Sequence, residues 1–187
     1  AAFYMALIKG MMLSLTPIIE SPKELLRELN NRVCRTMDRR VFVTMAYAVI
    51  DPGKGKLIYA RAGHQALLVR RARSGKVGEV IPGGIGLGLE KGDRFDGAVA
   101  EARLELKVGD VLLFYTDGII EAMNKKQEQY GEERLRSKLE VLPGKNAEQI
   151  RKEIIAALDK FVGPAERHDD MTLGSSSSDS LVSVPLW

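Results

Sequence analysis

The sequence lacks the residues that stabilise small secreted domains. Its 187 residues contain a single cysteine, Cys34, and only two histidines. One cysteine excludes an internal disulfide and a cysteine-rich zinc site. This usage fits a reducing compartment, and we expect a cytoplasmic protein.

Long apolar runs and an excess of one charge are also missing. Lys9 and Gly10 interrupt the apolar start of the chain, and no run reaches the roughly 18 to 20 residues that cross a bilayer. We therefore expect no membrane span. The formal net charge is only +3, and basic residues are interleaved with acids apart from Arg39-Arg40 and residues 70–73. A nucleic-acid-binding surface is not expected either.

The remaining composition is that of an ordinary globular protein. Hydrophobic residues make up 45% of the chain and charged residues 28%, with 7 prolines. These proportions exclude extended disorder, and the length is typical of one domain with one core.

Hydrophobic periodicity predicts two helices, a group of strands and then two more helices. Residues 1–13 form the first, mostly apolar helix. Ser21-Pro22-Lys23-Glu24 has the cap, the first-turn proline and the following glutamate of a helix start. Its buried stripe has fourfold spacing and consists of Leu25, Leu29, Val33 and Met37.

Strands are expected where the period changes to two. The predicted strands are residues 40–50, 56–62, 66–71, 98–106 and 111–116, the first three forming an antiparallel meander, and the later helices are residues 132–142 and 146–161. Strands that are apolar on both faces need cover on each side. The fold class is therefore α+β, a layered antiparallel β-sandwich flanked by helices. Residues 174–187 read as a serine-rich linker with an apolar tail.

Two acidic segments could carry chemistry. Asp117 follows an apolar run and precedes Gly118, and Asp169-Asp170 precedes a short predicted strand at residues 171–173. Adjacent strand residues face opposite sides, so one of the pair faces inward and the other supports a neighbour. Oxygen ligands without clustered histidine or cysteine favour Mg²⁺ or Mn²⁺. Paired ions of this kind activate water and neutralise a phosphoryl group, which makes phosphate hydrolysis the leading chemistry.

Each of these residues also has a purely structural interpretation. Asp117 could cap a short segment at residues 119–123, and Asp169-Asp170 could be a solvated acidic turn. His64 lies in a turn between strands, where a structural hydrogen bond is expected, and His168 is expected at the surface or beside the aspartates. Neither histidine has an identifiable serine or cysteine partner for nucleophilic catalysis.

The glycine-rich segment from Gly83 to Gly88 is a further candidate. It lacks the lysine and the serine or threonine of a phosphate-binding loop, and no helical pattern follows it. We interpret it as a close-packed loop. A nucleotide-binding, kinase-like domain that uses this loop is a minor alternative.

Five segments stand in a characteristic order. They are residues 1–7, Ala62-Gly63-His64, residues 110–122, residues 130–135 and Asp169-Asp170-Met171-Thr172. From residue 1 to about 173 the chain resembles the bacterial metal-dependent serine/threonine protein phosphatases of the PPM type, in the branch of stage II sporulation protein E and RsbU-like phosphatases. The resemblance implies that Asp117 and Asp169 hold a Mn²⁺ or Mg²⁺ pair. It also implies that the Gly118 region lines the site, with Asp170 and Thr172 supporting it.

The resemblance has two notable departures. The family's first metal motif, Gly-Asp-x-x-Gly-x-Gly, directly precedes the segment that matches Ala1-Ala2, and the sequence does not contain it. We therefore expect an N-terminally truncated domain with weak metal binding and low activity by itself. Arg61 stands where the family usually has asparagine before Ala-Gly-His.

The resemblance also implies a biological setting. The substrate is a phosphorylated anti-sigma-factor antagonist, whose dephosphorylation releases stress or sporulation transcription. Residues 1–37 contact an upstream sensor domain or coiled coil, and a homodimer is possible. The competing hypothesis from another class is a catalytically impaired, phosphatase-like interaction module.

Overall fold

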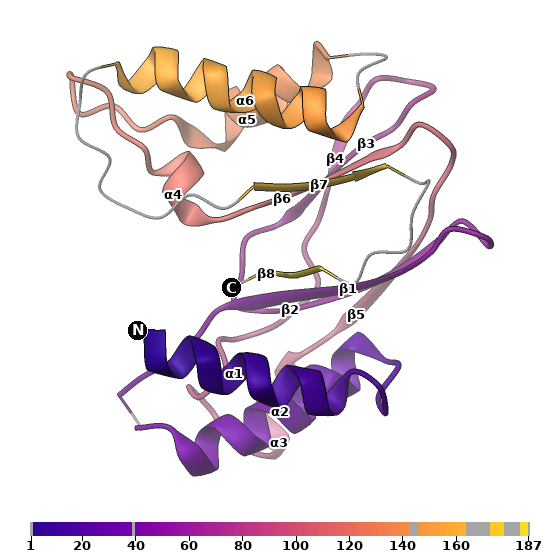
Figure 1. The fold of residues 1–187 in the computed structure, drawn as a ribbon, viewed down its shortest axis with the longest axis vertical. Helices are drawn as coiled ribbons and strands as arrows, with labels where there is room; N and C mark the ends of the chain where they lie inside the picture. Colours follow the sequence, from indigo (N-terminus) through magenta and orange to yellow (C-terminus); the bar gives the residue numbers. More distant parts are fainter. Residues whose placement is uncertain (1, 39, 143–145, 164–172, 178–183, 187) are drawn as a thin grey trace. The chain divides into compact units, whose positions relative to one another are not determined.

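The computed structural model describes residues 2–38, 40–142, 146–163, 173–177 and 184–186. These residues fall into two compact units. The first comprises Ala1–His64, Ile81–Glu105 and Val182–Trp187, and the second comprises Gln65–Val80 and Leu106–Leu181. Each unit has one four-stranded antiparallel sheet with helices over one of its faces (Figure 1).

The first unit has the strand order β5-β2-β1-β8. Its elements are α1 (Ala2–Leu15), α2 (Pro22–Thr36), β1 (Met45–Asp51), β2 (Lys56–Ala62), α3 (Asp93–Ala98), β5 (Glu101–Glu105) and β8 (Val184–Leu186). Helix α2 packs on β1 and β2, with α1 and α3 beside it.

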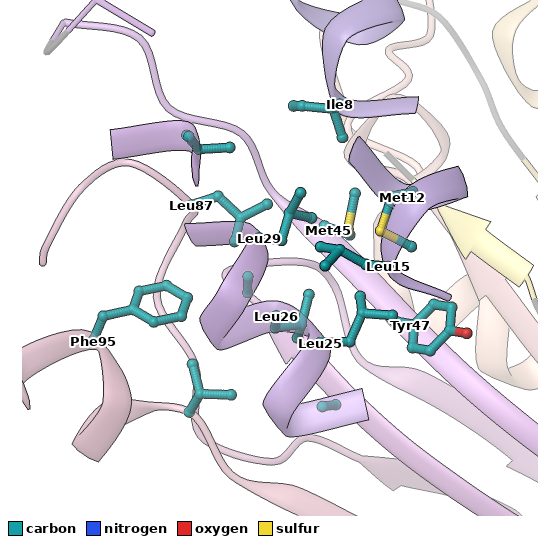
Figure 2. Close-up of a cluster of buried hydrophobic side chains, with 14 of the residues drawn as sticks. Ile8, Met12, Leu15, Leu25, Leu26, Leu29, Met45, Tyr47, Leu87 and Phe95 are labelled. Atoms are coloured by element: carbon teal, nitrogen blue, oxygen red, sulfur yellow. The ribbon is translucent and has the colours of Figure 1, made fainter. Parts of the chain in front are cut away.

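The core of the first unit lies between α2 and its sheet. Helix α2 begins as the sequence predicts, because the Ser21 side chain accepts a hydrogen bond from the Glu24 N–H at 3.3 Å. Its stripe is fully buried at Leu25, Leu29 and Val33. Figure 2 shows these leucines meeting side chains from α1, the sheet and the neighbouring loops, and the labelled contributors are Ile8, Met12, Leu15, Leu26, Met45, Tyr47, Leu87 and Phe95.

The second unit has the strand order β4-β3-β6-β7. Its elements are β3 (Leu67–Arg70), β4 (Val77–Val80), β6 (Val111–Tyr115), α4 (Asp117–Ile120), α5 (Gly131–Glu140), α6 (Ala147–Val162) and β7 (Leu173–Ser177). Helices α5 and α6 cover one face of this sheet (Figure 1). Helix α6 starts with a reciprocal capping box between Asn146 and Gln149.

The expected three-strand meander is wrong, and so is the single core. Strand β1 pairs with β2, whereas β3 pairs with β4 and β6 in the other sheet. All four residues of β3 are buried, so this strand needs a neighbour on each edge and cover on both faces. Periodicity cannot tell which sheet supplies them. The described residues accordingly form two hydrophobic clusters, one beside each set of helices.

Some element boundaries also differ from the predictions. Strand β1 begins at Met45, and before it only Val43 bridges to Leu87. Gly174 to Ser177 complete β7, where a linker was expected, and α3 and β4 were not predicted. The domain end at residue 173 stays a prediction. The mixed α+β class with antiparallel sheets is confirmed, and none of the helices in the described part of the chain is long and apolar enough to span a bilayer.

Candidate metal centre

Asp117 lies at the exposed end of a buried strand. All five residues of β6 are buried, Thr116 is 7% exposed, and Asp117 follows as the exposed first residue of α4. Its Oδ1 accepts a hydrogen bond from the neighbouring Gly118 N–H at 3.0 Å. The short helix has Thr116, not Asp117, at its N-cap position. The Asp117 side chain therefore accepts a hydrogen bond from a backbone N–H in the first turn of α4, although Thr116 holds the N-cap position, and its role as a metal ligand stays a prediction.

Strand β7 brings a second segment to the same end of β6. The antiparallel register places Leu173 opposite Tyr115, two residues before Asp117. The predicted residues Asp169, Asp170 and Thr172 lie outside the described residues, as does His168. Their roles in a site therefore stay predictions.

The described residues supply one of the expected metal ligands. Within residues 2–38, 40–142, 146–163, 173–177 and 184–186, no three histidine, cysteine, aspartate or glutamate side chains gather as a metal cluster. An exposed carboxylate beside a small, buried Gly118 suits a hard divalent cation such as Mg²⁺ or Mn²⁺. The donor chemistry at Asp117 thus fits the expected ions, and a complete site needs further ligands.

His64 belongs to a tightly held turn in the first unit. Its side chain is 6% exposed, and Nδ1 lies 3.4 Å from the Thr44 hydroxyl. The Arg61 guanidinium donates to the His64 carbonyl, and its Nε donates to the Pro82 carbonyl at 2.8 Å. Arg61 thereby ties the Gly63-His64 turn to the glycine-rich loop. The sequence identified Arg61 only as a departure from the family pattern. The available signal for its structural role was a basic side chain near the end of β2.

The glycine-rich loop is close-packed, as its structural interpretation predicted. A Cβ on Gly84 would lie only 1.9 Å from the Arg61 carbonyl oxygen. The loop leads to α3, which begins only at Asp93 and is six residues long. This geometry contradicts a phosphate-binding loop, in which the glycines lead directly into a helix N-terminus.

Comparisons with known proteins agree on one class. The profile of the family Stage II sporulation protein E (SpoIIE) matches residues 1–176. Phosphoserine phosphatase RsbU of Bacillus subtilis (strain 168) is 29% identical over 175 residues, which are 92% of this chain and 50% of RsbU.

Solved structures show the same fold. The SiaA-PP2C domain of Pseudomonas aeruginosa matches 92% of this chain and 66% of its own, with a TM-score of 0.73 and 19% identity. The Mn-presoaked phosphatase domain of SpoIIE from Bacillus subtilis matches 92% of this chain and 72% of its own, with a TM-score of 0.58 and 19% identity. The fold is that of the PP2C-like phosphatases.

The family match over residues 1–176 identifies one family within this class of phosphatases. The chain belongs to the SpoIIE family, in the SpoIIE and RsbU branch of the PPM phosphatases. It spans about half the length of RsbU.

Proposed function

We propose that this chain is the catalytic part of a metal-dependent phosphatase that hydrolyses phosphoserine or phosphothreonine on a regulatory protein. The observation that carries the proposal is the β6–β7 register. Because Leu173 lies opposite Tyr115, the chain enters β7 beside the strand end that bears Asp117. Leu173 directly follows the second family motif in the sequence, which supports a site shared by the two motifs.

Chain reach supports a common site. Asp169 precedes Leu173 by four residues, and an extended residue spans at most about 3.6 Å. The Cα atom of Asp169 therefore lies within about 14 Å of the Cα atom of Leu173. This upper limit allows the Asp117 and Asp169 carboxylates to hold a shared ion pair, as we propose.

The proposed roles follow from the residue types. Asp117 and Asp169 would hold Mn²⁺ or Mg²⁺, which when bound supplies an acidic water and neutralises charge on a phosphoryl group. The Asp117 carboxylate accepts a hydrogen bond from the Gly118 N–H through one oxygen, Oδ1, at 3.0 Å. Asp170 and Thr172 would support the Asp169 carboxylate through hydrogen bonds.

We also propose that the 187-residue chain by itself binds these ions weakly. The sequence does not contain the family's first metal motif, which would supply a further carboxylate. Two carboxylates are fewer than the oxygen ligands that such cations prefer. A catalytically impaired, phosphatase-like interaction module is the alternative function, and phosphate release by a longer chain distinguishes the two.

The proposed substrate is a phosphorylated anti-sigma-factor antagonist in the cytoplasm, consistent with the name of RsbU as a phosphoserine phosphatase. Residues 1–37 are the proposed contact for an upstream sensor or coiled coil, or for a second copy in a homodimer. Helix α1 supports this role, because Phe3 is 74% and Leu13 is 68% exposed. Exposed apolar side chains on one helix are typical of an interaction surface.

The test compares single substitutions in a longer version of the chain that includes the first motif. Asp117→Asn and Asp169→Asn should each lower Mn²⁺-dependent hydrolysis of a phosphoserine peptide by about 100-fold or more, beyond the usual loss for a supporting residue. Calorimetric titration should show weaker Mn²⁺ binding in both variants. Glu140→Gln removes an exposed carboxylate elsewhere in the second unit and is the matched control.

Two results would contradict the proposal. If Asp117→Asn bound Mn²⁺ and turned over substrate as Glu140→Gln does, Asp117 would not be a ligand. If the longer chain bound phosphoprotein but released no phosphate at any Mn²⁺ concentration, the interaction module would be the better interpretation.

A further inference from the structure

The turn between β3 and β4 gathers positive charge that the proposed phosphatase site does not use. It carries Arg70, Arg71, Arg73 and Lys76 within seven residues. The backbone closes the turn tightly, because the Arg71 N–H donates to the Lys76 carbonyl at 3.0 Å and the Gly75 N–H donates to the Arg71 carbonyl at 2.9 Å. Arg73 and Lys76 are exposed on this turn.

The buried carboxylate of Asp110 connects this turn to the turn that begins at Lys107, and its oxygens accept three hydrogen bonds. Asp110, which is 3% exposed, accepts hydrogen bonds from the Arg71 guanidinium at 2.7 Å, the Ala72 N–H at 2.9 Å and the Lys107 N–H at 3.1 Å. Burial raises the pKa of Asp110, but these three donors outweigh it and lower the pKa below its usual range. Asp110 thus neutralises Arg71, and within the described part of the chain no ion pair includes Arg73 or Lys76.

Arg70 is the unusual member of this cluster. Its side chain is 5% exposed and lies on the same sheet face as Leu68, between Val77 and Val111 in the two neighbouring strands. Its Nε is buried and has no hydrogen-bond partner in the part of the chain that the structure describes. No ion pair among those residues includes Arg70. A buried guanidinium without a counter-charge is costly, so an anion is expected to complete it.

The register separates this cluster from the candidate metal centre. Arg70 lies opposite Val111, the first residue of β6, whereas Asp117 follows the last residue of that strand. Six residues of extended chain correspond to roughly 20 Å. An anion at Arg70 would therefore not be held by the ions at Asp117.

We propose that the β3–β4 turn binds the phosphate group of a small anionic ligand. Arginine matches phosphate oxygens with paired hydrogen bonds. Because only 5% of Arg70 is exposed, a small molecule suits this position better than a protein surface. The guanidinium lies beside Gly75, since a Cβ there would be in ordinary contact, 3.7 Å, with an Arg70 terminal nitrogen. Arg73 and Lys76 at the rim would hold a second phosphate group.

The test uses the 187-residue chain with EDTA, so that no anion is held through a divalent ion. Isothermal titration with inorganic pyrophosphate should show saturable binding, tighter than that of orthophosphate. Arg73→Ala combined with Lys76→Ala should weaken pyrophosphate binding by about tenfold. The charge-matched control, Lys125→Ala with Lys160→Ala, removes two exposed lysines elsewhere in the same unit and should bind as the wild type does. Asp117→Asn should also bind pyrophosphate unchanged, which separates this site from the proposed function.

Arg70→Met should abolish the binding while the chain stays folded, since replacing a buried charge by an apolar side chain of similar length is tolerated. Equal weakening by the rim and control pairs would overturn the proposal as non-specific charge attraction. Tighter binding of a phosphoserine peptide than of pyrophosphate would overturn the assignment to a small ligand. Absence of saturable pyrophosphate binding to the wild-type chain would overturn it as well.

Discussion

Gly84 shows how one missing Cβ allows the glycine-rich loop to pack against the end of β2. A methyl group at this residue would collide with the Arg61 carbonyl oxygen at 1.9 Å, and a backbone atom cannot move aside cheaply. We expect Gly84→Ala to lower the free energy of unfolding by about 3 kcal/mol or more, measured by urea denaturation. Gly10→Ala in α1 is the control, because nothing lies within 4 Å of its added Cβ. That change should stabilise by about 0.5–1 kcal/mol, and equal effects at both positions would disprove the close approach.

Asp110 makes the free energy of unfolding depend on pH in the acid range. Its folded pKa is below the ordinary value of 3.8, so its contribution is complete above about pH 5 and is lost as the pH falls through the lowered folded pKa. Asp110→Asn should cost about 2 kcal/mol at pH 7, where it removes charged hydrogen bonds to a partly exposed Arg71. The gap to the wild type should shrink in urea titrations below pH 4. A gap that stayed constant down to pH 2 would contradict the assigned role.

At the scale of elements, the capping box of α6 makes a direct prediction. The Asn146 side chain accepts from the Gln149 N–H at 2.9 Å, and the Gln149 side chain accepts from the Asn146 N–H at 3.1 Å. Asn146→Ala should destabilise by about 1 kcal/mol, measured as a lower urea midpoint with an unchanged m-value. Asn146→Asp retains the acceptor and should keep the wild-type midpoint. If both variants lost the same stability, the cap would not be the cause.

The elements that sequence predicted best are those specified locally. The start of α2 at Ser21 and Pro22, the cap of α6 at Asn146 and the limits of β2 depend on neighbouring residues, and all were predicted. One partner of β3, the strand β6, lies about 40 positions away, and periodicity carries no information about this pairing. The helix α3 was missed because its six residues are too few to show a helical period.

The candidate site also has one part that local sequence specifies and another that depends on non-local pairing. The position of Asp117 at a strand end followed from the apolar run before it, because a buried strand must end where the first polar residues appear. The pairing of β7 beside it is non-local and became visible only in the register. Arg61 tying two loops together was not predictable from spacing, because its acceptors are the backbone carbonyls of His64 and Pro82, and a residue of any type can supply a backbone carbonyl.

At the scale of the whole chain, the two units are interleaved in sequence. Strand β5 pairs with β2 in the first unit, and the chain between them contains residues 65–80 of the second. Strand β6 pairs with β3 in the second unit, and the chain between them contains residues 81–105 of the first. When one sheet forms, it holds together the two ends of a chain segment that belongs to the other unit. The other sheet then closes a shorter effective loop, so its formation costs less conformational entropy. We infer that the units unfold together.

If the two units unfold together, a core substitution in one unit should also destabilise the other. Leu29 and Leu139 are fully buried in the clusters of the first and second units, and Leu29→Ala should destabilise by about 2–5 kcal/mol. In native-state hydrogen exchange, Leu29→Ala in the first unit should lower the protection of the slowest amides in β6 as much as in β2. Leu139→Ala in the second unit should likewise lower the protection of β2 as much as that of β6. If each substitution loosened only the strands of its own unit, the two sheets would be separate cooperative units and their interleaving would not couple them.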